Sequence, residues 1–207
     1  QMPVRAILTE IRGDWLCMKE VFRLPGWRDA AGCCWRCSAT NATMRCCGAD
    51  AQWRQERRDL WDLHVRWQEQ GLQPSPVLGS PFFQMRVFQI DWLHCMDLGV
   101  ACDFLGNVLT LLLKHMPGNS RMEQVRQLYL KMVEYYNRTG TQSRLDTLTL
   151  EMLAKPRQPP KLRARAGEAR ALVSFAREQT ALHFADEDPE EATAKQAAEH
   201  LEKCYSC

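Results

Sequence analysis

The chain has 207 residues, 45% of them apolar, and its 27 Lys and Arg nearly balance 25 Asp and Glu to give a net charge of +2. This length and apolar content are ordinary for a globular chain that buries a core, as one large domain or one and a half small ones. The balance of charge excludes an overall polycation, so any nucleic-acid binding must depend on a local patch.

Ten Cys residues would suggest a disulfide framework in a short secreted chain. However, the sequence has no charged segment followed by an apolar signal-peptide core, and its longest apolar run reads as too short to cross a bilayer. We therefore expect a thiol-reduced, intracellular protein without a membrane span. The chain enters an apolar stretch soon after Gln1 and stops at Cys207 without a tail, so we expect a fragment of a larger protein.

Two strands are predicted in the first half of the chain. Residues 4–11 mix β-branched and apolar side chains and stop at Gly13 and Asp14, which is typical of a strand that ends in a turn. Residues 85–90 alternate apolar and polar side chains and follow a loop rich in Pro, Gly and Ser. Between the strands, a Cys-rich patch at 33–47 precedes a predicted helix.

Helical spacing of apolar residues predicts three helices in the middle of the chain. The first runs from about 51 to 70 and ends at Gly71. The second, 97–116, is apolar on nearly every side and is expected in the middle of a core. A third helix follows a capping box of Ser120 and Glu123. Its apolar stripe is expected to contain these residues: Met122, Val125, Leu128, Met132 and Tyr136.

The last third of the chain is divided by charge. Residues 155–165 hold five basic side chains, three Pro and no acid, which indicates a linker-like basic loop. A helix is predicted from about 167 to 184. Residues 186–202 carry seven acids against one Lys, so we expect a final helix with an acidic, solvated face.

The Cys-rich patch contains a zinc-knuckle spacing. Cys34 and Cys37 are separated by two residues, which lets two thiolates share one tetrahedral zinc. Cys46 and Cys47 are adjacent and rarely reach the same ion together, so at most one of them should bind. The remaining ligands are expected among three residues: His94, Cys95 and Cys17. The alternative is a set of free thiols in a loop of small residues.

A second candidate site opens the predicted core helix. Asp91 and His94 are three residues apart, so both side chains face the same side of a helical turn. Asp91 could orient His94, or both could point at a metal ion. The local alternative is that Asp91 or Asp97 is an N-cap and that His94 is a core histidine.

The third candidate is a pair of carboxylates. Asp14 follows the first strand and Glu168 lies at the start of a predicted helix. Carboxylate oxygens suit Mg²⁺, so the pair could hold metal for phosphoryl transfer if the fold brings it together. Each residue also has a structural alternative, because Asp is common in turns and Glu is favoured in the first turn of a helix.

The order of these motifs resembles the catalytic region of eukaryotic cut-and-paste DNA transposases, such as the CACTA and Plavaka groups. The resemblance covers roughly residues 5–175 and is carried mainly by Asp91 and His94, which match an Asp-x-x-His motif of those enzymes. It implies an RNase H-like fold in which Asp14 is the second acid of the catalytic triad and Glu168 is the third. The first acid of the triad has no candidate under this assignment.

These observations predict an α/β protein that is mainly α, with a partial RNase H-like core. The expected divisions are 1–97 for this core and its Cys-rich insertion, and 98–154 for a helical insertion. Residues 155–185 form the basic loop and Glu-bearing helix, and 186–207 the acidic helix.

The resemblance implies Mg²⁺-dependent DNA strand cleavage and transfer, inactive in this chain alone, and a nuclear location. Structural zinc is the second expected cofactor. DNA phosphates are expected to contact the basic loop through three residues, Lys161, Arg163 and Arg165. The alternative function is a non-catalytic, zinc-stabilised helical module that binds a protein or a nucleic acid.

Overall fold

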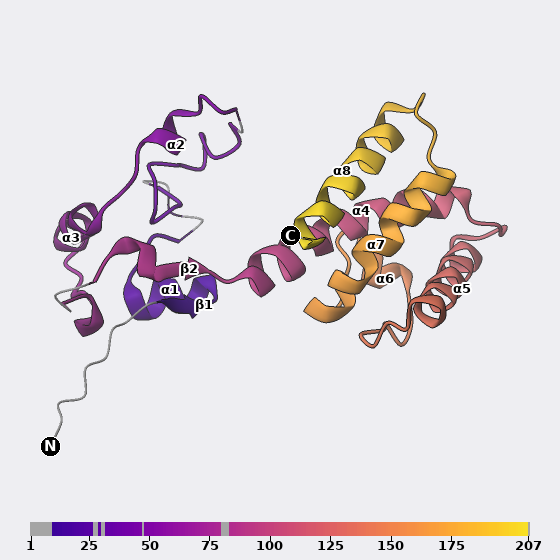
Figure 1. The fold of residues 1–207 in the computed structure, drawn as a ribbon, viewed down its shortest axis with the longest axis horizontal. Coiled ribbons are helices and arrows are strands. Elements are labelled where there is room, and N and C mark those ends of the chain that lie inside the picture. The colour runs from indigo at the N-terminus through magenta and orange to yellow at the C-terminus, as the bar shows by residue number, and fades with distance from the viewer. Residues whose placement is uncertain (1–9, 27–28, 30–31, 47, 80–82, 207) are drawn as a thin grey trace, which may run out of the picture. The chain divides into compact units, whose positions relative to one another are not determined.

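A computed structural model describes residues 10–26, 29, 32–46, 48–79 and 83–206. The chain forms two compact units, unit 1 (Gln1–Asp91) and unit 2 (Trp92–Cys207). The described residues are mainly helical, as predicted, and include one parallel pair of strands (Figure 1). The segments expected at 98–154, 155–185 and 186–207 all lie within unit 2.

Unit 1 is built around its strand pair. β1 (Ile11–Gly13) and β2 (Phe88–Ile90) are parallel, with Ile11 opposite Phe88 and Gly13 opposite Ile90. Most of the strand predicted at 4–11 falls outside the described residues. The strand predicted at 85–90 begins instead with a 3-10 turn, η2 (Met85–Val87), so only its second half pairs with β1.

The helices of unit 1 cover a small aromatic core. α1 (Trp15–Phe22) follows β1 directly, and a 3-10 turn, η1 (Pro76–Gly79), precedes β2. The indole Nε1 of Trp67 donates to the Arg23 carbonyl oxygen at 2.8 Å. The buried core contains these residues: Met18, Phe22, Leu24, Trp35, Leu63, Trp67, Leu78, Phe83, Val87 and Phe88.

The prediction of one helix over 51–70 is wrong. Two helices are present, α2 (Gln52–Gln55) and α3 (Leu60–Glu69), and the chain between them is extended. The break is explained by Asp59, whose carboxylate accepts from the Asp62 N–H while the Asp62 carboxylate accepts from the Asp59 N–H. This reciprocal capping box starts a new helix at Leu60.

Unit 2 is organised around a long central helix. A π-helix, η3 (Leu93–Ala101), continues into α4 (Cys102–Leu112) and a 3-10 turn, η4 (Leu113–His115). The α4 portion is buried, as predicted. By length and composition, Leu93–His115 is long and apolar enough to cross a membrane, but half of its apolar window is buried inside the fold. A core helix of a folded unit has the same properties.

α5 (Arg121–Thr139) starts after Ser120, as its sequence predicts. The Ser120 hydroxyl accepts from the Glu123 N–H at 3.2 Å, and Gly140 ends the helix in a left-handed conformation with φ 66°. The Glu123 carboxylate accepts from the Asn119 N–H and not from Ser120, so the box is not reciprocal. The predicted stripe is buried except at Met122, which is 76% exposed.

The rest of unit 2 packs around α4. α6 (Leu150–Leu153) leads into the basic loop, and α7 (Ala166–His183) packs against α4, η3 and α8 (Pro189–Ser206). The prediction that the last helix is simply a solvated acidic face is incomplete, because Ala198 and Leu201 of α8 are buried, Leu201 against Val173 of α7.

Candidate metal and nucleic-acid sites

Asp14 and Asp91 leave neighbouring strands at the same edge of the pair. Asp14 follows Gly13 at the end of β1, and Asp91 follows Ile90 at the end of β2. Gly13 and Ile90 are opposite one another in a parallel register, on strands about 4.8 Å apart, so Asp14 and Asp91 both follow the same edge of the pair. Sequence reasoning placed Asp91 with His94 in an Asp-x-x-His motif and missed this pairing.

Asp14 also has a structural role. Its Oδ1 atom accepts from the Cys17 N–H at 2.6 Å, which makes Asp14 the N-cap of α1. The structural alternative that the sequence left open for Asp14, a role in the turn after the strand, is therefore observed. A carboxylate has two oxygens, so capping through Oδ1 is compatible with metal binding through Oδ2.

Glu168 lies in the first turn of α7, where its Oε2 atom accepts from the Arg165 N–H at 2.8 Å. It belongs to unit 2, whereas Asp14 belongs to unit 1. Neither unit alone contains both carboxylates, and the closeness of Asp14 and Glu168 stays a prediction.

Cys34 and Cys37 interact as a pair of thiols. The Cys34 thiol is half-buried and hydrogen-bonds with the Cys37 thiol, and the Arg36 N–H donates to Cys34 Sγ at 3.3 Å. Burial is the main cause that raises the pKa of Cys34, with a smaller rise from Cys37. The Arg36 N–H opposes this rise, because a donor to sulfur favours the thiolate that a metal requires.

The other thiols of the patch differ from this pair. Cys33 Sγ is buried and contacts the Ala39 carbonyl oxygen at 3.4 Å and Met44 Sδ at 3.7 Å. Cys46 is exposed, and Cys47 lies outside the described residues. In the described part of the chain, no group of three or more His, Cys, Asp or Glu side chains is arranged to hold a metal ion. Zinc therefore stays a prediction that rests on the Cys34 and Cys37 pair.

The predicted partners around His94 are arranged differently from expectation. His94 is exposed in η3, so it is not a core histidine, and Asp91 is half-buried. Trp92, and neither Asp91 nor Asp97, occupies the N-cap position of η3.

Asp97 is a buried carboxylate that sequence reasoning considered only as a cap. It is fully buried, and its Oδ2 atom is 2.6 Å from Arg170 Nη2. Its Oδ1 atom accepts from the Tyr205 hydroxyl at 2.7 Å. Burial is the main cause that raises the pKa of Tyr205, and the hydrogen bond to Asp97 raises it further. These bonds tie η3 to α7 and to the end of α8.

The basic loop is not a linker. Leu162 is 1% exposed in the core of unit 2, and its N–H donates to the Cys102 carbonyl oxygen at 2.8 Å. Lys161 Nζ is 3.1 Å from the Asp103 carboxylate, and Arg163 donates to the Glu151 carbonyl oxygen. These cations remain partly exposed, but their local partners compete with any phosphate.

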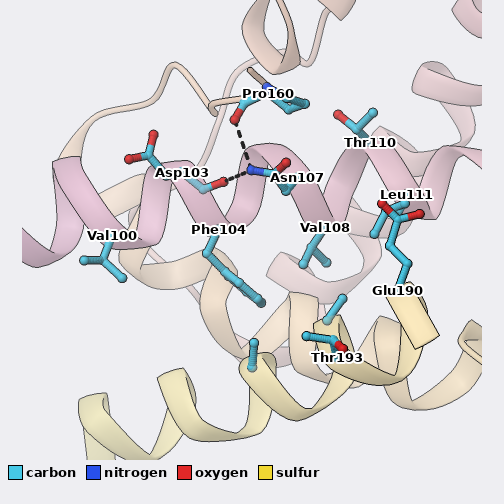
Figure 2. A pocket seen from close by; sticks show the side chains of 12 residues that line it. Val100, Asp103, Phe104, Asn107, Val108, Thr110, Leu111, Pro160, Glu190 and Thr193 are labelled. Carbon is cyan, nitrogen blue, oxygen red and sulfur yellow. Dashed lines mark hydrogen bonds between the residues drawn. The ribbon is translucent and has the colours of Figure 1, made fainter. Parts of the chain in front are cut away.

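A cavity lies between α4, Pro160 and α8 (Figure 2). Its volume is about 750 Å³, and its walls include Phe104, Val108 and Ala194. Asn107 Nδ2 donates to the Asp103 carbonyl oxygen at 2.8 Å and to the Pro160 carbonyl oxygen at 3.2 Å, which fixes one side of the cavity. No pattern in the sequence predicted it, because its walls come from segments far apart in the chain.

Comparisons of the chain with protein-family models, with curated proteins and with solved structures find no match. The candidate sites must therefore be judged from their own geometry.

Proposed function

We propose that this chain derives from a Mg²⁺-dependent DNA transposase with an RNase H-like core, in which Asp14 and Asp91 are metal-binding carboxylates. The observation that carries the proposal is the position of both residues directly after registered parallel strands. Both residues stand at the carboxyl edge of the strand pair, where parallel sheets commonly bind ligands. In this assignment Asp91 is the second acid and Asp14 becomes the first, for which the sequence assignment had no candidate.

The chemistry follows from the ligands. Asp14 and Asp91 would hold Mg²⁺ through their carboxylate oxygens, which suit that ion. The reaction would be attack of a water or a 3′-hydroxyl on a DNA phosphorus, in which a new P–O bond forms as the bond to the leaving oxygen breaks. The bound ion would supply stabilisation of the charge that develops on that oxygen. Two acids supply few ligands for two ions, so strand transfer would require Glu168 as the third acid.

Metal binding by unit 1 is the first test. Titration of the full chain with Mn²⁺, followed by electron paramagnetic resonance, should show one bound ion, and Asp14→Asn or Asp91→Asn should weaken its affinity at least tenfold. Asn is as good an N-cap as Asp, so the first change keeps α1 capped. Glu20→Gln, on the exposed side of α1, is the matched control. Unchanged affinity in both Asn variants would refute the metal site.

Strand cleavage is the second test and concerns Glu168. Two acids are too few for a two-metal site, so we expect Asp14 and Asp91 without Glu168 to give no Mg²⁺-dependent nicking of supercoiled DNA. Nicking that is present in the chain and lost with Glu168→Gln would show that Glu168 completes the site.

A zinc-stabilised binding module is the second candidate, favoured by the Cys34 and Cys37 thiol pair and by the Arg36 N–H that faces Cys34. In this case purified protein should contain about one equivalent of zinc. Cys34→Ser should remove the metal and lower the melting temperature, whereas Cys204→Ser, at an exposed thiol of α8, should not. If the protein without metal had the same melting temperature as the protein with metal, this function would be excluded.

A further inference from the structure

One corner of unit 2 brings two histidines and a buried glutamate together. His115 ends η4, His183 ends α7, and Glu191 lies in the first turn of α8. His115 Nε2 is 2.7 Å from Glu191 Oε1, and the imidazole rings of His115 and His183 stack with centroids 6.1 Å apart. η4 therefore meets the α7–α8 connection, and His115 is 76 residues away from Glu191 in the sequence.

Glu191 connects the start of α8 to its neighbours. Its residue is only 7% exposed, and its Oε2 atom accepts from the Ala185 N–H at 2.9 Å, in the turn between α7 and α8. The Ala185 N–H and then the His115 ring are the main causes that lower the pKa of Glu191. The carboxylate therefore stays charged below its ordinary pKa of 4.5, and the connection does not depend on its titration near neutral pH.

Among these three side chains, His183 is the one whose protonation the surrounding fold disfavours. Its Nε2 atom is buried and has no hydrogen-bond partner among the described residues. Burial, then Lys131, then His115 lower the pKa of His183 below its ordinary value of 6.5. Protonation therefore favours states in which the ring reaches water. The stability that neutral His183 contributes is present above about pH 6.5 and is lost as the pH falls through its lowered pKa.

The other charges at this corner do not compensate a protonated His183. Lys131 of α5 adds positive charge. Glu190 is 3.6 Å from Lys114, and Asp186 is 2.8 Å from Lys195, so both of these acids already face a cation. A proton on His183 therefore meets the stacked ring of His115 and a nearby lysine without a dedicated anion.

We propose that His115, His183 and Glu191 form an acid-sensitive latch, which holds the first turn of α8 against the end of η4 at neutral pH and releases it when His183 is protonated. The release has a defined consequence, because Glu190 and Thr193 of the same part of α8 line the cavity between α4 and α8 (Figure 2). The latch therefore controls one end of that cavity. It does not depend on the transposase ancestry proposed above.

Amide hydrogen exchange of the full chain, corrected for the intrinsic effect of pH, tests the latch. Between about pH 7.5 and about pH 5.5, the amides of 184–194 should lose protection while those of 125–136 in α5 keep theirs. The opening equilibrium should rise up to about tenfold for each pH unit by which the pKa of His183 lies below that of an exposed histidine. His183→Phe, which keeps a ring to stack on His115, should abolish the acid response, and His200→Gln, at an exposed site of α8, should leave it unchanged.

Two results would overturn the latch. The first is the same acid response in His183→Phe, which would assign the release to another group, such as Glu191 itself. The second is a pKa of His183 at or above that of an exposed histidine, measured directly by NMR titration of the unaltered chain. This second measurement decides the question even if the Phe variant does not fold.

Discussion

Gly106 packs against the backbone of Lys161 and Leu162, and Gly106→Ala is therefore a direct test of the fold. Gly106 lies inside α4, where Ala alone would stabilise a helix by about 1 kcal/mol. A Cβ at this position, however, would overlap the N and Cα atoms of Lys161 and lie 2.6 Å from the Leu162 backbone nitrogen. Because those are backbone atoms, the loop itself must move.

The expected loss follows from what the loop contributes. Moving it exposes part of Leu162, whose full burial is worth about 1.5–3 kcal/mol, and weakens three backbone hydrogen bonds worth about 0.5–1.5 kcal/mol each. These bonds join Lys161 to Leu153, Leu162 to Cys102 and Arg163 to Met152, each at 2.8 Å. After the helix-propensity gain of Ala, a net destabilisation of about 2–4 kcal/mol remains, since the loop shifts without detaching fully.

Urea and thermal unfolding monitored by circular dichroism would measure this change. For a unit of this size, we expect the melting temperature to fall by roughly 10 °C. Gly79→Ala is the matched control, because a Cβ there meets nothing within 4 Å, and it should stay within about 0.5 kcal/mol of the unaltered chain. A Gly106→Ala variant that melts at the same or a higher temperature would refute the close packing of the loop.

Three further changes test the sites. Tyr205→Phe removes a hydrogen bond to the buried Asp97 carboxylate and should lower stability by about 1.5–3 kcal/mol in urea unfolding, and an unchanged midpoint would argue against the bond. Because burial raises the pKa of Cys34, iodoacetamide should alkylate it more slowly near neutral pH than exposed Cys46, as peptide mass spectrometry would show. Replacing Lys161, Arg163 and Arg165 with alanine should weaken DNA binding and reduce its salt dependence, whereas an unchanged affinity would show that the loop does not contact DNA.

Local signals in the sequence predicted helix ends better than strands. Ser120 acts over three residues, so its role as an N-cap is readable from the sequence and is confirmed. Asp59 and Asp62 provide an equally local signal for the start of α3, but helical spacing on both sides concealed the break. The strand at 85–90 is shorter than predicted because a 3-10 turn occupies its first half.

The candidate sites depend on contacts that no short pattern contains. Asp97 is separated from Arg170 by 73 residues and from Tyr205 by 108, so its burial cannot be inferred from its neighbours in the chain. The pairing of Asp14 with Asp91 likewise depends on strand register. Residue types alone suggested carboxylate chemistry at Asp14, but the sheet determines which partner lies beside it.

The π-helix η3 restricts which insertions and deletions unit 2 can accept. Wide π turns usually occur as isolated bulges, whereas this one continues over nine residues, Leu93–Ala101. Removing one residue before Asp97 would let the segment wind as an ordinary α-helix, in which each residue turns by about 100°. The residues before the deletion would then rotate relative to Asp97, and the chain would leave Asp91 in a different direction. Changes of length in this segment should therefore be tolerated far less than substitutions on its exposed side, such as at Val100.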